Sequence, residues 1–308
     1  MTFFSGVIPP MVTPLLSHEQ LDVKSVDRLI PHLIDGGVNG IFVLGTTGEG
    51  PSLSYEIRYE LVERTCEATA GNVPVLVGIT DSCYSESLAL AEHAQNSGAA
   101  AVVAAAPFYF QASTADLRSW FLRLADESPL PVMLYNMPSC VRATLDPDLI
   151  ADLSEHQNIV GIKDSSGDLR YFEQICSSFR RPGRFCVFMG PEERLADAVA
   201  MGADGGVCGG ANLLPHVYST LYRVALDRRT DEIPALHRII DSLFSEVYRD
   251  ETRTMRLIPG LKHALSLTGI CNDVTAPPFR SVSDLHAERI AKAVPLLMSA
   301  AAQFTPVA

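Results

Sequence analysis

Residues 159–164 read Ile-Val-Gly-Ile-Lys-Asp, a short apolar run that ends in two charged residues. Because consecutive positions of this run are apolar, it is typical of a parallel strand that is covered on both faces. Seven runs of similar kind accompany it along the chain, and they span Gly6–Pro10, Gly40–Leu44, Val73–Ile79, Ala101–Ala105, Val132–Tyr135, Phe185–Met189 and Gly205–Gly209. Together with Ile159–Lys163 they predict eight parallel strands.

Stretches with helix signals separate these runs. Asp22 is a predicted N-cap for a helix over 23–34, which Gly36-Gly37 should end. Ser54 and Ser82 are expected to start the next two helices. Later helix starts are expected at Asp168, Pro191 and Asn212. Eight strand–helix units in series favour a closed (β/α)8 barrel, because the chain contains neither G-x-G-x-x-G nor G-x-x-x-x-G-K-[ST], the phosphate loops of many open sheets.

Three more helical segments follow the eighth unit, over Asp231–Arg249, Thr252–Thr268 and Ser283–Ala302. No low-complexity linker divides the chain. The fold class is therefore predicted to be α/β. Residues 1–228 are expected to form a (β/α)8 TIM barrel, and residues 229–308 a C-terminal helical region packed on the barrel.

Composition excludes several classes of partner. The formal net charge of −12 argues against nucleic acid and acidic membrane surfaces, because no field of Lys and Arg is available to bind phosphates. No apolar run reaches the ~20 residues of a membrane span, and residues 1–10 lack the pattern of a secretory signal. Seven scattered cysteines without a C-x-x-C pair favour a reduced, cytoplasmic protein. The eight histidines have no metal-binding spacing, so no metal site is expected.

Polar residues stand where the predicted strands end, and in a (β/α)8 barrel these ends form the catalytic face. The segments placed there by this rule are Gly45-Thr46-Thr47-Gly48-Glu49, Pro107-Phe108-Tyr109, Tyr135-Asn136, Lys163-Asp164, Gly190 and Gly209-Gly210.

Lys163 is the most informative of these residues, because it is one of only four lysines and ends a strand that should be buried. Desolvation favours the neutral amine, and a neutral amine can attack a ketone to form an imine. The alternatives are an ion pair with Asp164 or a phosphate-binding lysine. Tyr135 ends the preceding strand, so its phenol could move protons beside Lys163, or it could be a core residue.

The Gly45–Gly48 turn offers two threonine hydroxyls and several backbone N–H groups, which together could hold a carboxylate. A plain loop is the alternative. Tyr109 follows Pro107 in the loop after the fourth strand, where it could also be a packing aromatic.

Three segments in this order resemble the dihydrodipicolinate synthase / N-acetylneuraminate lyase family: Gly45-Thr46-Thr47-Gly48-Glu49, Tyr135-Asn136-x-Pro138 and Gly161-Ile162-Lys163-Asp164. The resemblance runs from about Phe4 to the C-terminal helices. It implies a (β/α)8 barrel with a C-terminal helical region, assembled as a homotetramer or a dimer.

The resemblance also implies roles for single residues. Lys163 matches the lysine that forms a Schiff base with pyruvate, and Tyr135 matches the tyrosine that moves protons at the imine. Thr46 and Thr47 match the pair that binds the pyruvate carboxylate and relays protons. Tyr109 matches a tyrosine that a neighbouring subunit lends to the site. The substrate-binding residues are predicted to be Thr46, Thr47, Gly48, Gly190 and Cys208.

Two departures from the family pattern bear on the substrate. Synthases that use aspartate semialdehyde carry an arginine where this chain has Cys140, and Arg142 lies two residues farther on. An acidic residue directly after the lysine, here Asp164, is more similar to 2-keto-3-deoxy sugar acid aldolases. Glu192 and Glu193 could bind the hydroxyls of a polyhydroxy substrate, or could belong to the first turn of a helix, where acids favour the dipole.

The expected function is that of a class I aldolase or lyase, which cleaves or forms a carbon–carbon bond between pyruvate and an aldehyde on a 2-keto-3-deoxy sugar acid or a similar 2-oxo acid. The imine to Lys163 is covalent, so no metal or organic cofactor is required. The alternatives are 4-hydroxy-tetrahydrodipicolinate synthase, a sugar-acid dehydratase that uses the same imine, and a regulator that binds a 2-oxo acid without turnover. The intact set of Lys163, Tyr135 and Thr46 speaks against the regulator.

Overall fold

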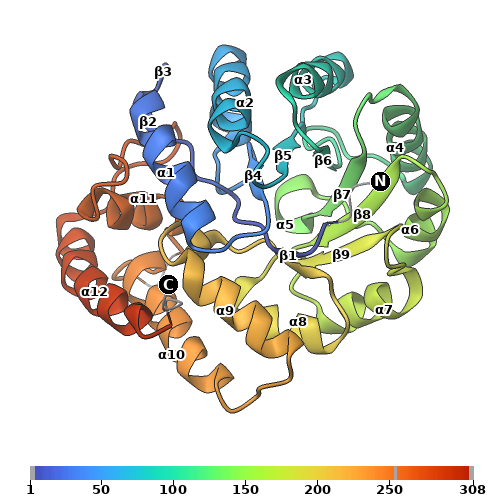
Figure 1. Cartoon of the computed structure of the whole chain (residues 1–308). Coiled ribbons are helices and arrows are strands. Elements are labelled where there is room, and N and C mark those ends of the chain that lie inside the picture. Colours follow the sequence, from blue (N-terminus) through green and yellow to red (C-terminus); the bar gives the residue numbers. More distant parts are fainter. Residues whose placement is uncertain (1–3, 253–254, 305–308) are drawn as a thin grey trace.

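The protein, seen in a computed structural model that describes residues 4–252 and 255–304, is built around a parallel barrel (Figure 1). Eight of its described strands form one sheet in the order β1-β10-β9-β8-β7-β6-β5-β4. These strands are β1 (Gly6–Val7), β4 (Ile41–Val43), β5 (Val75–Gly78), β6 (Ala101–Ala105), β7 (Val132–Asn136), β8 (Ile159–Asp164), β9 (Cys186–Met189) and β10 (Gly205–Gly206). The predicted (β/α)8 barrel is confirmed.

The barrel closes where the segment after β1 meets β4. Pro10 and Phe42 form a parallel bridge, in which Phe42 N donates to Pro9 O at 3.0 Å and Met11 N donates to Phe42 O at 2.8 Å. The strand β1 is shorter than the predicted Gly6–Pro10 because Pro9 and Pro10 have no N–H to donate to a ladder. A two-stranded antiparallel ribbon, β2 (Leu15–Ser17) and β3 (Gln20–Leu21), precedes the first helix.

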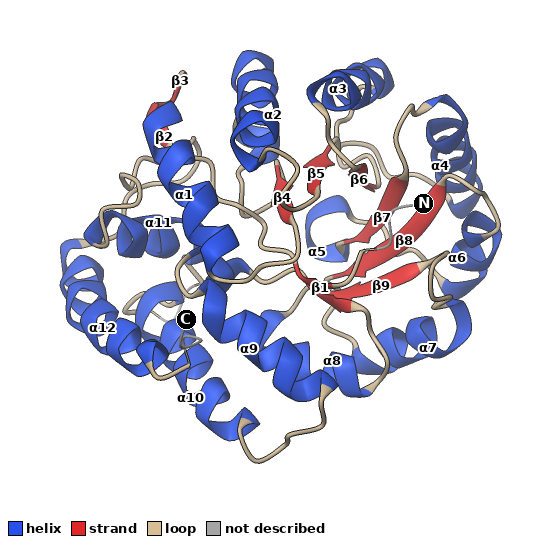
Figure 2. Cartoon of the chain, in the orientation of Figure 1, coloured by secondary structure: helices blue, strands red, loops and turns tan. Residues whose placement is uncertain are grey.

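Helices surround the strands, as Figure 2 shows by colour. Those of the barrel are α1 (Val23–Asp35), α2 (Tyr55–Thr69), α3 (Tyr84–Ser97), α4 (Thr114–Glu127), α5 (Pro138–Val141), α6 (Pro147–Ser154), α7 (Leu169–Phe179), α8 (Leu195–Ala200) and α9 (Pro215–Leu226). Short 3-10 helices are Gly50–Ser52, Glu192–Arg194 and Gly209–Asn212.

Three of the six predicted helix starts in the barrel are confirmed by side-chain caps. The side chains of Asp22, Ser54 and Asp168 each accept a hydrogen bond from the backbone of the first helical turn. The predicted start at Ser82 is two residues early, because Tyr84 is the first residue of α3. Pro191 is the N-cap of the 3-10 helix Glu192–Arg194, which leads directly into α8.

The predicted helix start at Asn212 is wrong. The helix α9 begins at Pro215, and the Asn212 side chain is fully buried. Its amide donates to Pro10 O at 3.0 Å, and its oxygen accepts from Val12 N at 3.0 Å. Asparagine is a good cap because its side chain bonds free backbone groups, but here those groups belong to the chain after β1.

The C-terminal helices gather at one side of the barrel, beside α1 and α9 (Figure 1). They are α10 (Ile233–Leu243), continued by a π-helical turn (Phe244–Tyr248), then α11 (Leu257–Leu267) and α12 (Asp284–Ala302). Residues 253 and 254 of the predicted Thr252–Thr268 helix lie outside the described residues. The same holds for residues 1–3 of the predicted barrel region 1–228 and for residues 305–308 of the predicted C-terminal region 229–308. The boundary between residues 228 and 229 stays a prediction; it falls between α9 and α10. Among the described helices, none combines the length and apolar character that crossing a membrane requires.

Candidate active site

Lys163 lies inside the barrel near the end of β8, in register with Tyr135 on β7 and Phe188 on β9. The residue is only 4% exposed. Its Nζ lies 4.0 Å from the centroid of the Tyr135 ring and 5.1 Å from that of the Phe42 ring. The lysine amine therefore lies near two aromatic rings, that of Tyr135 on the neighbouring strand β7 and that of Phe42 on β4, which does not adjoin β8 in the sheet.

Asp164 faces away from this amine, because successive side chains of a strand point to opposite faces. Its carboxylate accepts hydrogen bonds from Asn136 Nδ2 at 2.7 Å and from Ser166 Oγ at 2.9 Å. Burial raises the pKa of Asp164, and these donors oppose that shift. Among the ion pairs of the described residues, none joins Asp164 to Lys163, so this alternative for the lysine is not supported.

Thr46 and Tyr135 meet beside Lys163. The Thr46 Oγ1 and Tyr135 Oη atoms lie 3.3 Å apart, within hydrogen-bond distance. Thr46 belongs to the tight turn after β4, in which Glu49 N donates to Thr46 O at 3.1 Å and Gly50 N donates to Gly45 O at 3.2 Å. The turn therefore presents a hydroxyl to the tyrosine that neighbours the lysine.

A cavity of about 310 Å³ opens in front of Lys163. Five of the predicted catalytic and substrate-binding residues line it, namely Lys163, Tyr135, Thr46, Thr47 and Gly190. Pro10, Val207, Gly209, Glu192 and Glu193 contribute from the other strand ends, and Phe244, Leu257 and Ile258 from the C-terminal helical region. This last group was not predicted, because its contact with the barrel mouth joins segments far apart in the sequence.

A second cavity, of about 210 Å³, shares Thr46, Tyr135 and Met137 with the first and is mostly apolar. Cys140 lines it, as does Phe108. Arg142 lines neither cavity; it is exposed and adopts a left-handed backbone with φ of 52° at the end of α5. The guanidinium that could have compensated for Cys140 therefore lies away from both cavities.

Three other predicted site residues lie off the cavities. The Gly48 carbonyl accepts a hydrogen bond from Thr13 Oγ1 at 2.6 Å, and a side chain at Gly48 would meet Met11 O. Cys208 is fully buried, and burial raises the pKa of its thiol well above the usual value. Tyr109 is 73% exposed and packs edge-on against Phe110.

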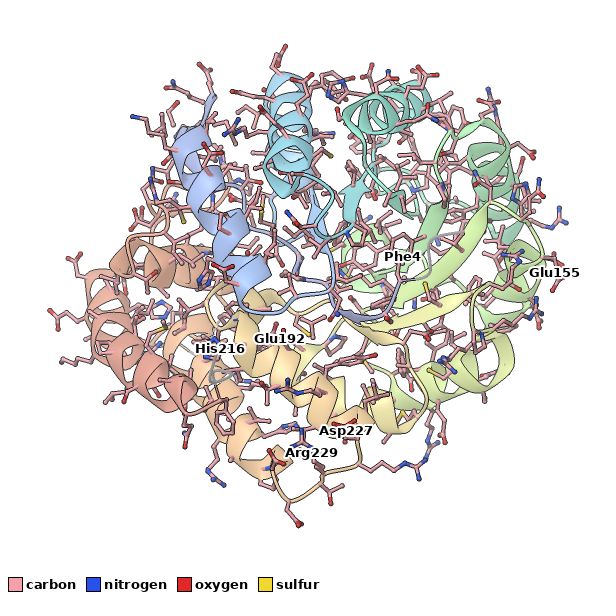
Figure 3. The ribbon with its side chains drawn as sticks, viewed as in Figure 1. Phe4, Glu155, Glu192, His216, Asp227 and Arg229 are labelled. Atoms are coloured by element: carbon pink, nitrogen blue, oxygen red, sulfur yellow. The ribbon has the colours of Figure 1, made fainter. Side chains whose placement is uncertain are left out.

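Glu192 lies inside the fold, whereas Glu155, also labelled in Figure 3, projects at the edge of the molecule. The Glu192 carboxylate accepts hydrogen bonds from Gly210 N at 2.6 Å, Tyr218 Oη at 2.8 Å and Tyr248 Oη at 3.0 Å. Burial raises the pKa of Glu192 to about 7, although the three donors oppose the shift. The helix interpretation of Glu192 is confirmed, since it is the first residue of a 3-10 helix. It also lines the cavity, but both of its carboxylate oxygens are engaged by these internal donors, and a contact with substrate hydroxyls stays a prediction.

This pKa predicts how stability depends on pH. The folded value of about 7 exceeds the ordinary value of 4.5, so between these pH values the folded state binds more protons than the unfolded state. The contribution of Glu192 is fully present below the lower value and is lost as pH rises through the upper one. Between about pH 5 and about pH 8 we expect the wild type to lose about 2 kcal/mol more unfolding free energy than Glu192→Gln.

Urea unfolding of both proteins at the two pH values measures this difference. Every other titrating group is common to the pair, so its effect cancels in the comparison. Equal losses of unfolding free energy in the wild type and in Glu192→Gln would contradict a raised pKa at this carboxyl.

Within residues 4–252 and 255–304, no group of three or more His, Cys, Asp or Glu side chains is arranged to hold a metal ion. The seven cysteines all carry free thiols.

The chain is similar in sequence and in structure to known proteins. The model of the dihydrodipicolinate synthetase family matches residues 3–296. A relative from Escherichia coli K12, named "Probable 2-dehydro-3-deoxy-D-pentonate aldolase YjhH", is 31% identical over 294 residues, which cover 94% of this chain and 96% of the relative.

Solved structures give the same result. Dihydrodipicolinate synthase from Bacteroides thetaiotaomicron superposes with a TM-score of 0.92 at 41% identity, covering 96% of this chain and 100% of that one. The Escherichia coli K12 prophage protein YagE, determined in complex with pyruvate, superposes with a TM-score of 0.88 at 28% identity, covering 96% of this chain and 99% of that one. The similarity therefore includes the barrel and the C-terminal helices alike.

Proposed function

The chain belongs to the dihydrodipicolinate synthetase family, and on that premise we propose that it is a class I aldolase in which Lys163 forms an imine with pyruvate. The observation that carries this proposal is the buried Lys163 amine, which lines a cavity beside the paired hydroxyls of Thr46 and Tyr135. Asp164, the nearest acid in sequence, is engaged by Asn136 and Ser166 and leaves the amine available for a carbonyl.

The chemistry follows from the arrangement of these groups. The substrate carboxylate binds at Thr46 and Thr47, and the Lys163 amine adds to the C2 ketone. Loss of water gives a protonated imine, which withdraws electrons from C3. The C3–C4 bond can then break, and its electron pair forms the enamine of pyruvate.

Proton transfer completes the cycle. Tyr135 accepts the proton of the C4 hydroxyl as the aldehyde leaves, and Thr46 Oγ1, 3.3 Å from Tyr135 Oη, is placed to pass it on. Protonation of the enamine at C3 and hydrolysis of the imine then release pyruvate and return the amine. In the opposite direction the same steps add pyruvate to an aldehyde.

The aldehyde partner is proposed to be a polyhydroxy aldehyde, so that the cleaved substrate is a 2-keto-3-deoxy sugar acid. Among the described residues, neither cavity is lined by an arginine, and Cys140 and the exposed Arg142 provide no clamp for a second carboxylate. Glu193 lines the cavity and is half-buried, so it can accept hydrogen bonds from substrate hydroxyls. A sugar-acid dehydratase is the second candidate, because it would start from the same imine.

Borohydride reduction in the presence of pyruvate tests the central step. We expect one reduced adduct per chain, mapped by peptide mass to Lys163. A folded protein that gives no adduct would remove the imine mechanism and favour a regulator that binds another 2-oxo acid. Where the adduct forms, kcat/KM values for cleavage of sugar acids, for their dehydration and for condensation with aspartate semialdehyde decide among the three enzymes.

We also propose that a second copy of the chain supplies Tyr109 to this site. The side chain is exposed in the single chain, in the loop whose Phe108 lines the second cavity. If the tyrosine acts across an interface, turnover per subunit should fall when the protein is diluted to a monomer, and Tyr109→Phe should lower turnover only in the oligomer. Unchanged turnover in a monomer demonstrated by ultracentrifugation would contradict this proposal.

A further inference from the structure

The turn that carries Thr46 and Thr47 has an unusual backbone at both ends. Leu44 and Glu49 adopt left-handed conformations, with φ of 59° and 58° respectively. Neither residue is glycine, and residues other than Gly, Asn and Asp rarely adopt this backbone region, because Cβ approaches the following carbonyl. Such strain persists where surrounding structure holds the residue in place. The question is which contacts hold Glu49.

The Glu49 side chain points to the C-terminal helical region. One carboxylate oxygen forms an ion pair with Lys262 of α11, and the other accepts a hydrogen bond from Ala276 N at 2.7 Å. The Lys262 ammonium also donates to Val274 O at 2.7 Å. Both charged side chains are completely buried. A residue of the barrel turn is therefore held at both carboxylate oxygens by residues more than two hundred positions away.

The backbone of Glu49 transmits this restraint to the threonines. Glu49 N donates to Thr46 O at 3.1 Å, so the position of Glu49 fixes one end of the segment that contains Thr46 and Thr47. Thr46 and Thr47 both line the cavity in front of Lys163. Displacement of Glu49 would therefore move the two hydroxyls that face the substrate.

Stability alone is a weak reason for such a pair. Moving two charges out of water is costly, and an apolar filling of similar volume is often equally stable. Burial lowers the pKa of Lys262, and the charge of Glu49 opposes that shift. A buried pair of this kind does fix geometry, because each charge must keep its partner.

We propose that Glu49 and Lys262 are positioning residues, through which the C-terminal helical region holds the Gly45–Gly48 turn in the conformation that binds the substrate carboxylate. This inference rests on the proposed function for the role of the turn. Neither side chain lines the cavity, so both act through Thr46 and Thr47.

Two matched double variants separate positioning from plain structural support. In Lys262→Met/Glu49→Ala both charges are removed together, so that no lone charge stays buried. Lys262→Met/Glu49→Gly differs from it in one methyl group, and glycine adopts the left-handed conformation without strain. Both variants lose the ion pair and the contact with Ala276. Only in the alanine variant does a Cβ atom strain the left-handed conformation, so only there is the backbone expected to leave it.

The readout is the pyruvate concentration that gives half-maximal borohydride trapping. We expect this concentration to rise about tenfold in the alanine variant, the change that ~1.4 kcal/mol of turn strain would give. In the glycine variant it should return most of the way to the wild-type value. The KM for the aldehyde should stay near the wild-type value in both. Wild-type half-saturation in the alanine variant, or an equal rise in the two variants, would overturn the inference.

Two further measurements keep the result decisive. Should the alanine variant not fold, Lys262→Met/Glu49→Leu takes its place in the comparison with the glycine variant, because leucine cannot accept the Ala276 N–H and its backbone carries the same strain. Should wild-type protein give no pyruvate adduct, the proposed function fails by itself. Hydrogen exchange at the Glu49 and Gly50 amides then tests the restraint alone: exchange no faster in the double variants than in the wild type would overturn it.

Discussion

Lys163→Met is expected to abolish the pyruvate adduct and to lower aldol turnover at least about a thousandfold, the scale on which loss of a covalent nucleophile acts. Methionine retains an unbranched apolar side chain of similar length but lacks the amine, whose Nζ lies near the rings of Phe42 and Tyr135 and adds to the ketone. The fold should therefore survive while the imine is lost. The measurements are intact mass after borohydride reduction and turnover with the best substrate from the aldehyde screen.

The matched control is Lys292→Met, which removes an exposed lysine on α12. It should give the same adduct and turnover as the wild type. An adduct that persists in Lys163→Met would assign the imine to another lysine and contradict the proposed mechanism. If Lys163→Met lost turnover but still formed the adduct, the proposed mechanism would also be contradicted, because the imine that precedes carbon–carbon cleavage would not be on Lys163.

The barrel was predictable because each strand is a local pattern. Runs such as Ile159–Lys163 are apolar on both faces, and no long-range information is needed to recognise them. Errors arose where a local signal met a distant partner. Asn212 is a residue type that favours helix caps, but its side-chain amide forms hydrogen bonds with the backbone of Pro10 and Val12, after β1. The sequence does not state which backbone groups a short polar side chain will find.

The site was predictable in part for the same reason, because five of the eight predicted site residues line the cavity, whereas Gly48, Cys208 and Tyr109 do not. Lys163, Tyr135, Thr46, Thr47 and Gly190 line the cavity as expected. Cys208 does not, although its neighbours on both sides do, because successive residues at a strand end face opposite ways.

What the sequence could not supply are the long-range contacts of buried charged residues. Lys262 was not among the predicted site residues, and its pairing with Glu49 is seen only in the structure. Glu192 is similar, since its two tyrosine partners come from α9 and from the π-helical turn of the C-terminal region. Both cases join the barrel mouth to the C-terminal helices, a relation that no local pattern encodes.

Tyr135→Phe is expected to lower kcat by about a hundredfold to a thousandfold, within the usual range for loss of a proton-transfer group. The ring that packs on Lys163 is retained, so pyruvate should still be trapped on the lysine at saturating concentration. The effect should therefore appear in the steps after imine formation. Tyr84→Phe is the matched control, because the Tyr84 hydroxyl bonds Glu127 at an exposed site and the residue lines neither cavity.

The partnership with Thr46 gives this prediction its sharper form. The two hydroxyls lie 3.3 Å apart, so a proton relay requires both. Thr46→Val should therefore also lower kcat. The kcat of Tyr135→Phe/Thr46→Val should be only slightly below that of the slower single variant, because removal of either member already breaks a relay that needs both. Losses that multiply in the double variant would mean that the tyrosine and the threonine act independently. In that case Thr46 would bind the carboxylate without relaying protons, and the proton accepted by Tyr135 would have to leave by another route.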